Sequence, residues 1–319
     1  RHVIRVVAGA LQDERGRVLL GQRCADDLRH PNQWEFPGGK LEAGESPQMA
    51  IAREFSEELD LSSRAADWHT VRRGMAIDPV RGLQLQLLTA RFRALPHKRV
   101  HQALSWVWPD AAAALTLGHL DRQLLRWLAA PRWLRIVDSN CPGQLRTVGP
   151  FSRQCWRLLR WPELESGSYA DALERELSTR PTAGPVMVHN RLDLCTRPGV
   201  AGVHLSARVA QQYRERPVSW GSWLSVACHD NAEIAHATQI EADFILLSPV
   251  RRTPSHPDRL PLGWPAFGRL AQLAHCPTLA LGGIFPVDLE YVRRMGGQGV
   301  AGIRGFSPAA RSRLPLSRR

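Results

Sequence analysis

The chain has 319 residues, of which 44% are hydrophobic and 23% are charged, and this is enough apolar material for two ordinary domains with their own cores. This composition excludes a disordered tail and a small disulfide-stapled fold. The six cysteines lie far apart without a CxxC pair, so we expect reduced thiols rather than a disulfide framework or a structural zinc site. No run of about 18 apolar residues and no signal-peptide pattern is present, which predicts a cytoplasmic protein without a membrane segment.

The formal net charge of +12 could indicate a polyanionic partner. Among the basic residues, however, only Lys40 and Lys98 are lysine, which indicates a general preference for arginine. The arginines are spread along the whole chain without a basic block. We therefore expect no nucleic-acid groove, although a positive field could still steer small anionic substrates.

The first 130 residues predict strands, a glycine-rich loop and two helices. Ser46 followed by Pro47 is typical of a helix start, with serine at the N-cap and proline at the first helical position. We expect this helix to end near Leu59. The other expected elements are a hairpin of Val3 to Leu11 with Val18 to Leu20, a loop from Pro37 to Gly44, strands from Leu83 to Phe92 and from Ala103 to Val107, and a helix from Asp121 to Leu128.

After a boundary at Ala129 to Arg132, short apolar runs alternate with helical stretches. This alternation predicts a parallel (β/α)8 barrel, and hence domains at residues 1–130 and 131–319. The eight expected strands are Trp133 to Val137, Trp156 to Arg160, Val186 to His189, Gly202 to Leu205, Trp223 to Ala227, Phe244 to Leu247, Thr278 to Leu281 and Val300 to Ile303.

A motif in the first domain carries the chemistry. From Gly39 the chain reads glycine, five residues, Glu45, seven residues, Arg53 and Glu54, one aromatic and one further residue, Glu57 and Glu58, and then Asp60 after one residue. On a helix, Glu54, Glu57 and Glu58 form one stripe of carboxylates about one turn long. A solvated acidic helix face would explain these three alone. Glu45 and Arg53 at fixed offsets favour instead a site for a hard divalent cation such as Mg²⁺.

This spacing resembles the Nudix box, in which Asp60 replaces the usual glycine. Because Asp60 falls at the residue that ends the helix, we expect it to adopt a positive φ at some cost. The segments around Arg23, from Trp34 to Lys40 and from His101 to Trp106 are similar to the MutT branch, the 8-oxo-dGTP diphosphatases. The resemblance implies a Nudix α/β/α sandwich with a mixed sheet.

The resemblance also implies roles for individual residues. Glu54 is the expected general base, and Arg53 and Glu57 assist catalysis. Substrate contacts fall on Arg23, Phe36, Gly38 and Asp121. Mg²⁺, with Mn²⁺ as a substitute, falls on Gly39, Glu45, Glu54, Glu57 and Glu58. MutT has a further metal-binding glutamate where this chain has Ser105, so the metal set is expected to rest on the helix and Glu45.

Asp121 has two interpretations. Its carboxylate could accept hydrogen bonds from the N1–H and N2–H₂ edge of guanine, a pair of donors that adenine lacks. It could equally be the N-cap of the helix that follows.

The second domain resembles thiamine phosphate synthase, through segments such as Gly202 to Leu205 and Ser248 to Val250. Its metal-binding acids and lysines are replaced, among them by Asn190, Pro162 and His256, which predicts weak stabilisation of a departing diphosphate. Gly282 and Gly283 could bind a phosphate through their N–H groups or could form a plain tight turn. The histidines at strand ends show no metal-ligand spacing, so we expect no metal there.

The sequence therefore predicts a Mg²⁺-dependent nucleoside triphosphate pyrophosphohydrolase that converts 8-oxo-dGTP to 8-oxo-dGMP and pyrophosphate, in the cytoplasm, with a degenerate barrel. The expected partner is a small nucleotide, without nucleic acid or membrane. Two alternatives stay open for the barrel: residual thiamine phosphate synthase activity, or a non-catalytic metabolite-binding or scaffold role. The oligomeric state is not predicted.

Overall fold

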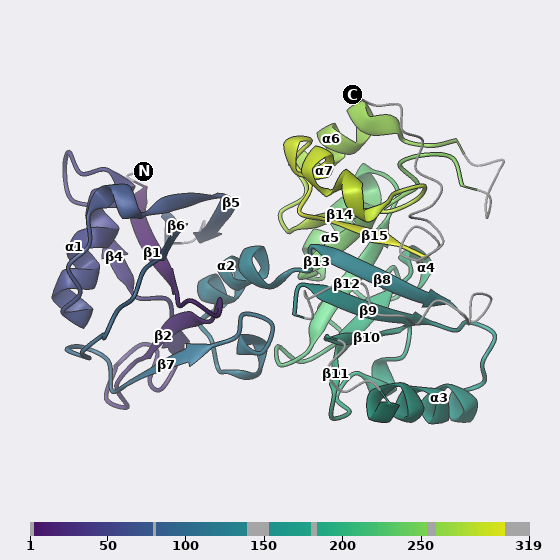
Figure 1. The fold of residues 1–319 in the computed structure, drawn as a ribbon, viewed down its shortest axis with the longest axis horizontal. Coiled ribbons are helices and arrows are strands. Elements are labelled where there is room, and N and C mark those ends of the chain that lie inside the picture. The colour runs from purple at the N-terminus through teal and green to yellow at the C-terminus, as the bar shows by residue number, and fades with distance from the viewer. Residues whose placement is uncertain (1–2, 79–80, 139–152, 180–183, 254–259, 304–319) are drawn as a thin grey trace. The chain divides into compact units, whose positions relative to one another are not determined.

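The computed structural model describes residues 3–78, 81–138, 153–179, 184–253 and 260–303. These divide into two compact units, with the division after Ala129. Figure 1 shows both units. Within the described ranges, no helix has the length and apolar character needed to span a bilayer.

The first unit is built on a mixed sheet with strand order β3-β2-β1-β6-β5, in which β4 also pairs with β1 and β7 with β2. The expected hairpin of β1 and β2 is confirmed, and β6 runs parallel to β1. The strands are β1 (Ile4–Gln12), β2 (Val18–Gln22), β3 (Trp34–Glu35), β4 (Gly38–Lys40), β5 (His69–Asp78), β6 (Leu83–Arg91) and β7 (Ala103–Val107).

Two helices, α1 (Pro47–Leu59) and α2 (His119–Ala129), lie on opposite sides of this sheet (Figure 1). The predicted start of α1 is confirmed, since the Ser46 hydroxyl accepts a hydrogen bond from the Met49 N–H at 3.2 Å. The predicted end is also confirmed, with Asp60 at φ 57°. Two 3-10 turns complete the unit, η1 (Ala65–Asp67) and η2 (Ala112–Ala114).

Burial of one face fixes α1 on the sheet. Ile51, Phe55 and Leu59 are fully buried and pack with Val7 of β1 and with Trp68. The Phe55 and Trp68 rings meet edge to face at 4.6 Å between centroids, a favourable geometry for aromatic pairs. Because these apolar residues face the sheet, the acidic residues of α1 lie on the other sides of the helix.

The second unit is a closed barrel of eight parallel strands, as predicted. The strands are β8 (Trp133–Asp138), β9 (Cys155–Arg160), β10 (Val186–His189), β11 (Val200–Leu205), β12 (Trp223–Cys228), β13 (Phe244–Leu247), β14 (Thr278–Ala280) and β15 (Gly299–Gly302). The helices are α3 (Ser166–Thr179), α4 (Ala207–Ala210), α5 (Asn231–Gln239), α6 (Gly263–Leu273) and α7 (Leu289–Arg294), with 3-10 turns η3 (Leu192–Leu194) and η4 (Pro286–Asp288).

Large aromatic side chains fill the inside of the barrel. Trp156 of β9 meets Trp223 of β12 and Phe244 of β13 edge to face, at 5.7 and 5.8 Å between ring centroids. Strand β9 pairs with neither β12 nor β13, so these contacts cross the interior. Because side chains alternate along a strand, Arg160 of β9 also points inward, at the carboxyl end where barrel enzymes place their sites.

Candidate active site

Arg53 of α1 holds together the acidic residues of the motif. Its Nε donates to Glu45 Oε1 at 3.1 Å and one terminal nitrogen donates to Glu45 Oε2 at 3.0 Å, a two-point pairing. The other terminal nitrogen reaches Glu54 Oε1 at 2.9 Å and Glu57 Oε2 at 3.3 Å. The carbonyl of Lys40 accepts a further bond at 3.0 Å. One guanidinium therefore fixes the loop before α1 against the helix, and its hydrogen bonds lower the pKa of Glu45.

The glycines of the loop let two glutamates of α1 lie close to the backbone. A Cβ on Gly39 would come within 2.1 Å of Glu54 Oε1, so glycine leaves the space that this carboxylate fills. The N–H of Gly38 donates to Glu58 Oε2 at 3.2 Å. Glu57, by contrast, keeps 59% of its side chain exposed. The predicted stripe thus has two enclosed carboxylates and one that faces solvent.

The donor set fits a hard divalent cation. Glu45, Glu54, Glu57 and Glu58 offer only oxygen atoms, the ligands that Mg²⁺ prefers. Burial, together with the charge of nearby Glu54, raises the pKa of Glu58 to about 7, as expected of carboxylates that lie close together away from solvent. In this arrangement Glu45, Glu54 and Glu57 bond to Arg53. No three acidic, histidine or cysteine side chains of the described residues are grouped to hold an ion.

Arg23, at the end of β2, is held by two carboxylates. Its Nε donates to Glu35 Oε2 at 2.7 Å, a terminal nitrogen lies 2.7 Å from the same oxygen, and the second terminal nitrogen donates to Asp27 Oδ2 at 2.9 Å. These partners hold the guanidinium, whose side chain is still 35% exposed. The arginine is therefore oriented and open to an anionic ligand.

Phe36 follows Glu35 in the chain and contacts Asp121 of α2. Phe36 is buried, and its backbone N–H donates to Asp121 Oδ1 at 2.9 Å. Burial raises the pKa of Asp121 to about 7, so its carboxyl changes charge near neutral pH. The N-cap interpretation is wrong because α2 begins at His119, two residues before Asp121.

The short segment from Glu35 to Gly39 thus joins the predicted residues of the site. Glu35 holds Arg23, the Phe36 amide holds Asp121, Gly38 meets Glu58 and Gly39 meets Glu54. Glu35 itself was not among the predicted site residues.

His101 was also missed as a site residue. Its ring is 2% exposed and its Nε2 lies 3.2 Å from Glu35 Oε1. In the sequence it is one histidine in a segment before β7, and neither spacing nor periodicity connects it with Glu35.

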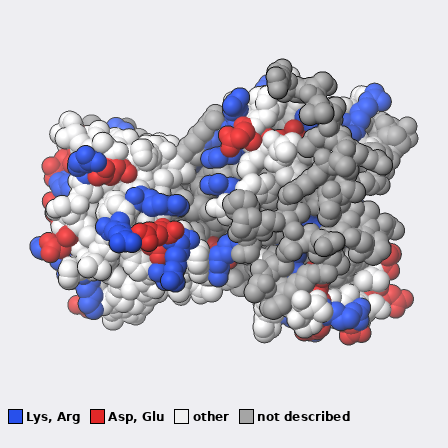
Figure 2. Space-filling view, viewed as in Figure 1, with Lys and Arg blue, Asp and Glu red and all other residues white. Residues whose placement is uncertain are grey.

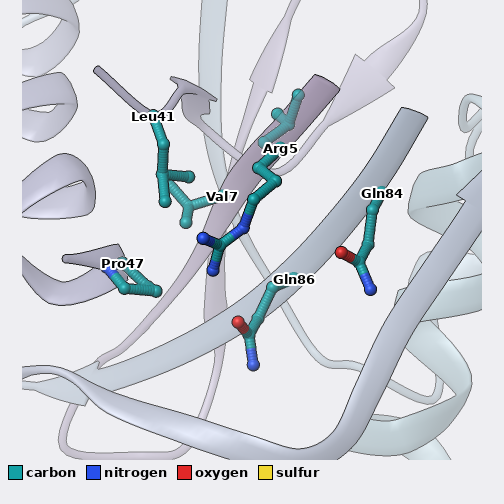
Figure 3. A pocket seen from close by; sticks show the side chains of 7 residues that line it. Arg5, Val7, Leu41, Pro47, Gln84 and Gln86 are labelled. Carbon is teal, nitrogen blue, oxygen red and sulfur yellow. The ribbon is translucent and has the colours of Figure 1, made fainter. Parts of the chain in front are cut away.

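A small pocket lies near the start of α1. Figure 3 shows the guanidinium of Arg5 pointing toward Pro47 and Gln86, with Gln84 and Leu41 also at its wall. With a volume of about 20 Å³ it could hold a water molecule but not a nucleotide. It is therefore not the substrate site.

On the face of the first unit seen in Figure 2, charges of both signs are mixed. Figure 2 shows arginines and carboxylates side by side on the face in view. Exposed pairs such as Arg93 with Glu14 and Arg99 with Asp60, both within 2.7 Å, illustrate this mixing. The visible face of this unit offers no broad basic surface.

In the barrel, polar side chains gather at the carboxyl ends of the strands. Arg160 donates to Asp138 Oδ2 at 2.6 Å, and the rings of His189 and His204 stack at 5.9 Å between centroids. Burial lowers the pKa of His189 to about 4, which keeps this ring neutral. His256, which replaces a lysine of the synthase, lies outside the described residues.

The glycine pair of the barrel has a sufficient structural explanation. Gly282 and Gly283 have φ of 96° and 65°, a conformation that favours glycine. A Cβ on either would come within 2.8 Å of Pro249 or Arg251. The tight-turn interpretation therefore accounts for both residues, while phosphate binding at this turn stays a prediction.

Comparison with known proteins agrees with both units. The NUDIX domain family matches residues 2–128, and the thiamine monophosphate synthase family matches residues 159–306. CTP pyrophosphohydrolase of Escherichia coli is 31% identical over 136 residues, which cover 43% of this chain and 98% of that protein. Putative 8-oxo-dGTP diphosphatase 2 of Mycobacterium tuberculosis is 39% identical over 152 residues, covering 45% and 94%.

For the barrel, Putative thiamine-phosphate synthase 2 of Aquifex aeolicus is 28% identical over 181 residues, covering 55% of this chain and 97% of that protein. Together with the arginine-linked glutamates in the first unit and the closed parallel barrel in the second, these matches identify both parts. The chain belongs to the Nudix family, as a hydrolase of phosphoric anhydrides with a MutT-type domain, and this domain is fused to a thiamine phosphate synthase-like barrel.

Proposed function

We propose that the first unit is a Mg²⁺-dependent nucleoside triphosphate pyrophosphohydrolase that acts on 8-oxo-dGTP in the cytoplasm and yields 8-oxo-dGMP and pyrophosphate. The observation that carries this proposal is the guanidinium of Arg53, which bonds to Glu45, Glu54 and Glu57 at once. The relatives named 8-oxo-dGTP diphosphatase support the choice of substrate.

The cation would be held by Glu54, Glu57 and Glu58, with Glu45 and the carbonyl of Gly39 beside them. When bound, Mg²⁺ neutralises phosphate charge and makes a coordinated water more acidic, and Mn²⁺ could replace it. Ser105 of β7, opposite Leu20 of β2, adds no carboxylate to this set.

The other roles in the reaction fall to side chains of the first unit. Glu54 accepts the proton of the attacking water as general base, while Arg53 holds its carboxylate at 2.9 Å. The water oxygen bonds to one of the two phosphorus atoms that flank the α–β bridging oxygen. The bond from that phosphorus to the bridging oxygen breaks, and the bridging oxygen leaves with the other product, which gives the monophosphate and pyrophosphate. Arg23 binds the phosphates, and its fixed guanidinium reduces the entropy lost on binding.

The base would lie by Phe36 and Asp121. The Asp121 carboxylate can accept from the N1–H and N2–H₂ of a guanine-type base. It already accepts the Phe36 N–H at 2.9 Å through Oδ1, so Oδ2 and the second lone pair of Oδ1 remain as acceptors. A pyrimidine triphosphate is the competing substrate class, since a relative is named CTP pyrophosphohydrolase.

Substitution of Glu57 tests the assignment of the catalytic cluster. Glu57 is 59% exposed, so Glu57→Gln should fold normally and lose nearly all turnover, because a metal ligand and a charge are removed. Glu42→Gln, on an exposed residue of the preceding loop, is the matched control and should keep its activity. Retention by Glu57→Gln of more than about a tenth of the activity would contradict the assignment.

For the barrel we propose that thiamine phosphate synthesis has been lost. The carboxyl end of β10 presents His189 and Asn190, and Arg160 is paired with Asp138. Among the described residues of the barrel, few groups are therefore left to hold Mg²⁺ and a departing diphosphate. Expression of the full chain in a strain that lacks thiamine phosphate synthase should not restore growth without thiamine. Growth would instead show that the barrel is a second enzyme.

A further inference from the structure

A buried histidine supports the arginine that we assign to the phosphates. The His101 ring is 2% exposed, and its Nε2 lies 3.2 Å from Glu35 Oε1. The other oxygen of Glu35 accepts from Arg23 at 2.7 Å. The three side chains therefore form one chain of contacts from the interior to the partly exposed guanidinium.

The chemistry of the ring sets the direction of this contact. An ionised carboxylate only accepts hydrogen bonds, so the proton lies on His101 Nε2 and the ring donates to Glu35. The second nitrogen, Nδ1, is buried without a hydrogen-bond partner. Nδ1 therefore takes no part in this contact, and the ring bonds to Glu35 through Nε2 alone.

Packing fixes the ring in this place. A Cβ on Gly21 of β2 would come within 2.4 Å of the His101 ring, so the glycine leaves the surface against which the ring lies. The backbone on the other side is also fixed, because Gly21 pairs with Glu35 across β2 and β3. Gly21 of β2 thus contacts both residues, the His101 ring by packing and Glu35 by strand pairing.

We propose that His101 is a positioning residue for phosphate binding. It orients the Glu35 carboxylate, and this carboxylate in turn orients the Arg23 guanidinium toward the substrate. The inference rests on the proposed function of the first unit. It adds to that function a residue that is not itself assigned to the substrate or to the cation, although its ring lies near enough to Glu58 to influence the pKa of that carboxyl.

Two substitutions separate the hydrogen bond from the volume of the ring. His101→Phe keeps an aromatic ring but removes the hydrogen-bond donor. This variant should raise KM for the triphosphate by roughly 5- to 50-fold, as expected for a lost bond to a charged group, and should change kcat less than about threefold. His101→Gln restores an N–H at similar reach and should recover most of this loss. Equal behaviour of the two variants would overturn the proposal, as would a loss confined to kcat.

A double-mutant cycle tests the route of the effect. In a Glu35→Gln background, His101→Phe should add little to KM, because the carboxylate that it orients is already gone. Full additivity of the two changes would contradict a chain that passes through Glu35.

A measurement without turnover keeps this inference distinct from the proposed function. In nitrogen-15 spectra, the Arg23 Nε–H signal, identified by its loss in Arg23→Lys, should be sharp in the unaltered protein and in His101→Gln, and broadened in His101→Phe. If no nucleotide is hydrolysed but this pattern is seen, the function fails and the positioning contact stands. An unchanged signal in His101→Phe would overturn the positioning role whatever the activity.

Discussion

The Glu54 carboxylate lies in the space that a side chain on Gly39 would occupy, with Oε1 only 2.1 Å from the position of that missing Cβ. The same oxygen accepts from Arg53 at 2.9 Å. A glycine in the loop and an arginine on the helix therefore set the position of the proposed general base together.

This relationship predicts the effect of Gly39→Ala. The added methyl group would push away the end of a flexible side chain rather than backbone, so the fold should survive while Glu54 moves. We expect kcat to fall by roughly 100-fold or more, because a base must stay within hydrogen-bond reach of its proton. Melting temperature and kcat are to be measured together. Gly167→Ala, where a Cβ would meet nothing within 4 Å, is the control and should leave kcat unchanged.

Arg53→Lys tests whether one guanidinium is needed for several carboxylates. A lysine keeps the charge but cannot make the two-point bond to Glu45 and also reach Glu54 and Glu57. We expect kcat to fall roughly 10- to 100-fold, with more Mg²⁺ needed for half-maximal activity. A Mg²⁺ titration of both proteins measures this, and a lysine variant with normal activity would show that only the charge matters.

The pKa of Asp121 predicts a pH dependence of stability. Because burial raises this pKa to about 7 from 3.8, the folded state binds more protons than the unfolded state between about pH 4 and pH 7. The contribution of the protonated Asp121 carboxyl to the free energy of unfolding is therefore complete below about pH 4. It is lost as the pH rises through 7. Asp121→Asn cannot ionise and can still accept the Phe36 N–H, so it should melt higher than the unaltered protein at pH 8. At pH 4 the difference should disappear, and a difference that is the same at both pH values would contradict the assignment.

Asp121→Ala tests base recognition separately from stability. If the carboxylate contacts the guanine edge, kcat/KM for the guanine-type substrate should fall by roughly 10- to 1000-fold. Hydrolysis of a poor pyrimidine triphosphate should change little. Equal losses for both substrates would remove Asp121 from the site.

The sequence was sufficient for those parts of the site that depend on local spacing. Ser46 and Asp60 mark the confirmed ends of α1. Glu45 and Arg53, which their offsets in the motif singled out, are found paired in the structure. Local spacing also predicted the eight barrel strands, since buried parallel strands are continuous apolar runs.

Contacts between distant segments could not be predicted in this way. Glu35 and His101 are 66 residues apart and meet only because β2 pairs with both β3 and β7. Strand β5 was missed because its polar residues show no clean alternation. The segment from Pro37 to Gly44, expected as a loop, contains the short strand β4, which its glycines conceal and which forms by pairing with β1. Helix α2 begins at His119, two residues before the expected start. Helical spacing predicted that Glu57 lies beside Glu54 and Glu58. It did not predict that the Glu57 side chain is exposed, because the exposure depends on how α1 packs on the sheet.

The most direct test of the proposed function is an assay of the full-length protein with Mg²⁺ against a panel of triphosphates, namely 8-oxo-dGTP, dGTP, CTP and dATP, with identification of the products. The proposal predicts the highest kcat/KM for 8-oxo-dGTP, with 8-oxo-dGMP and pyrophosphate released in equal amounts. Release of inorganic phosphate with a diphosphate product, or a preference for CTP over 8-oxo-dGTP, would contradict it.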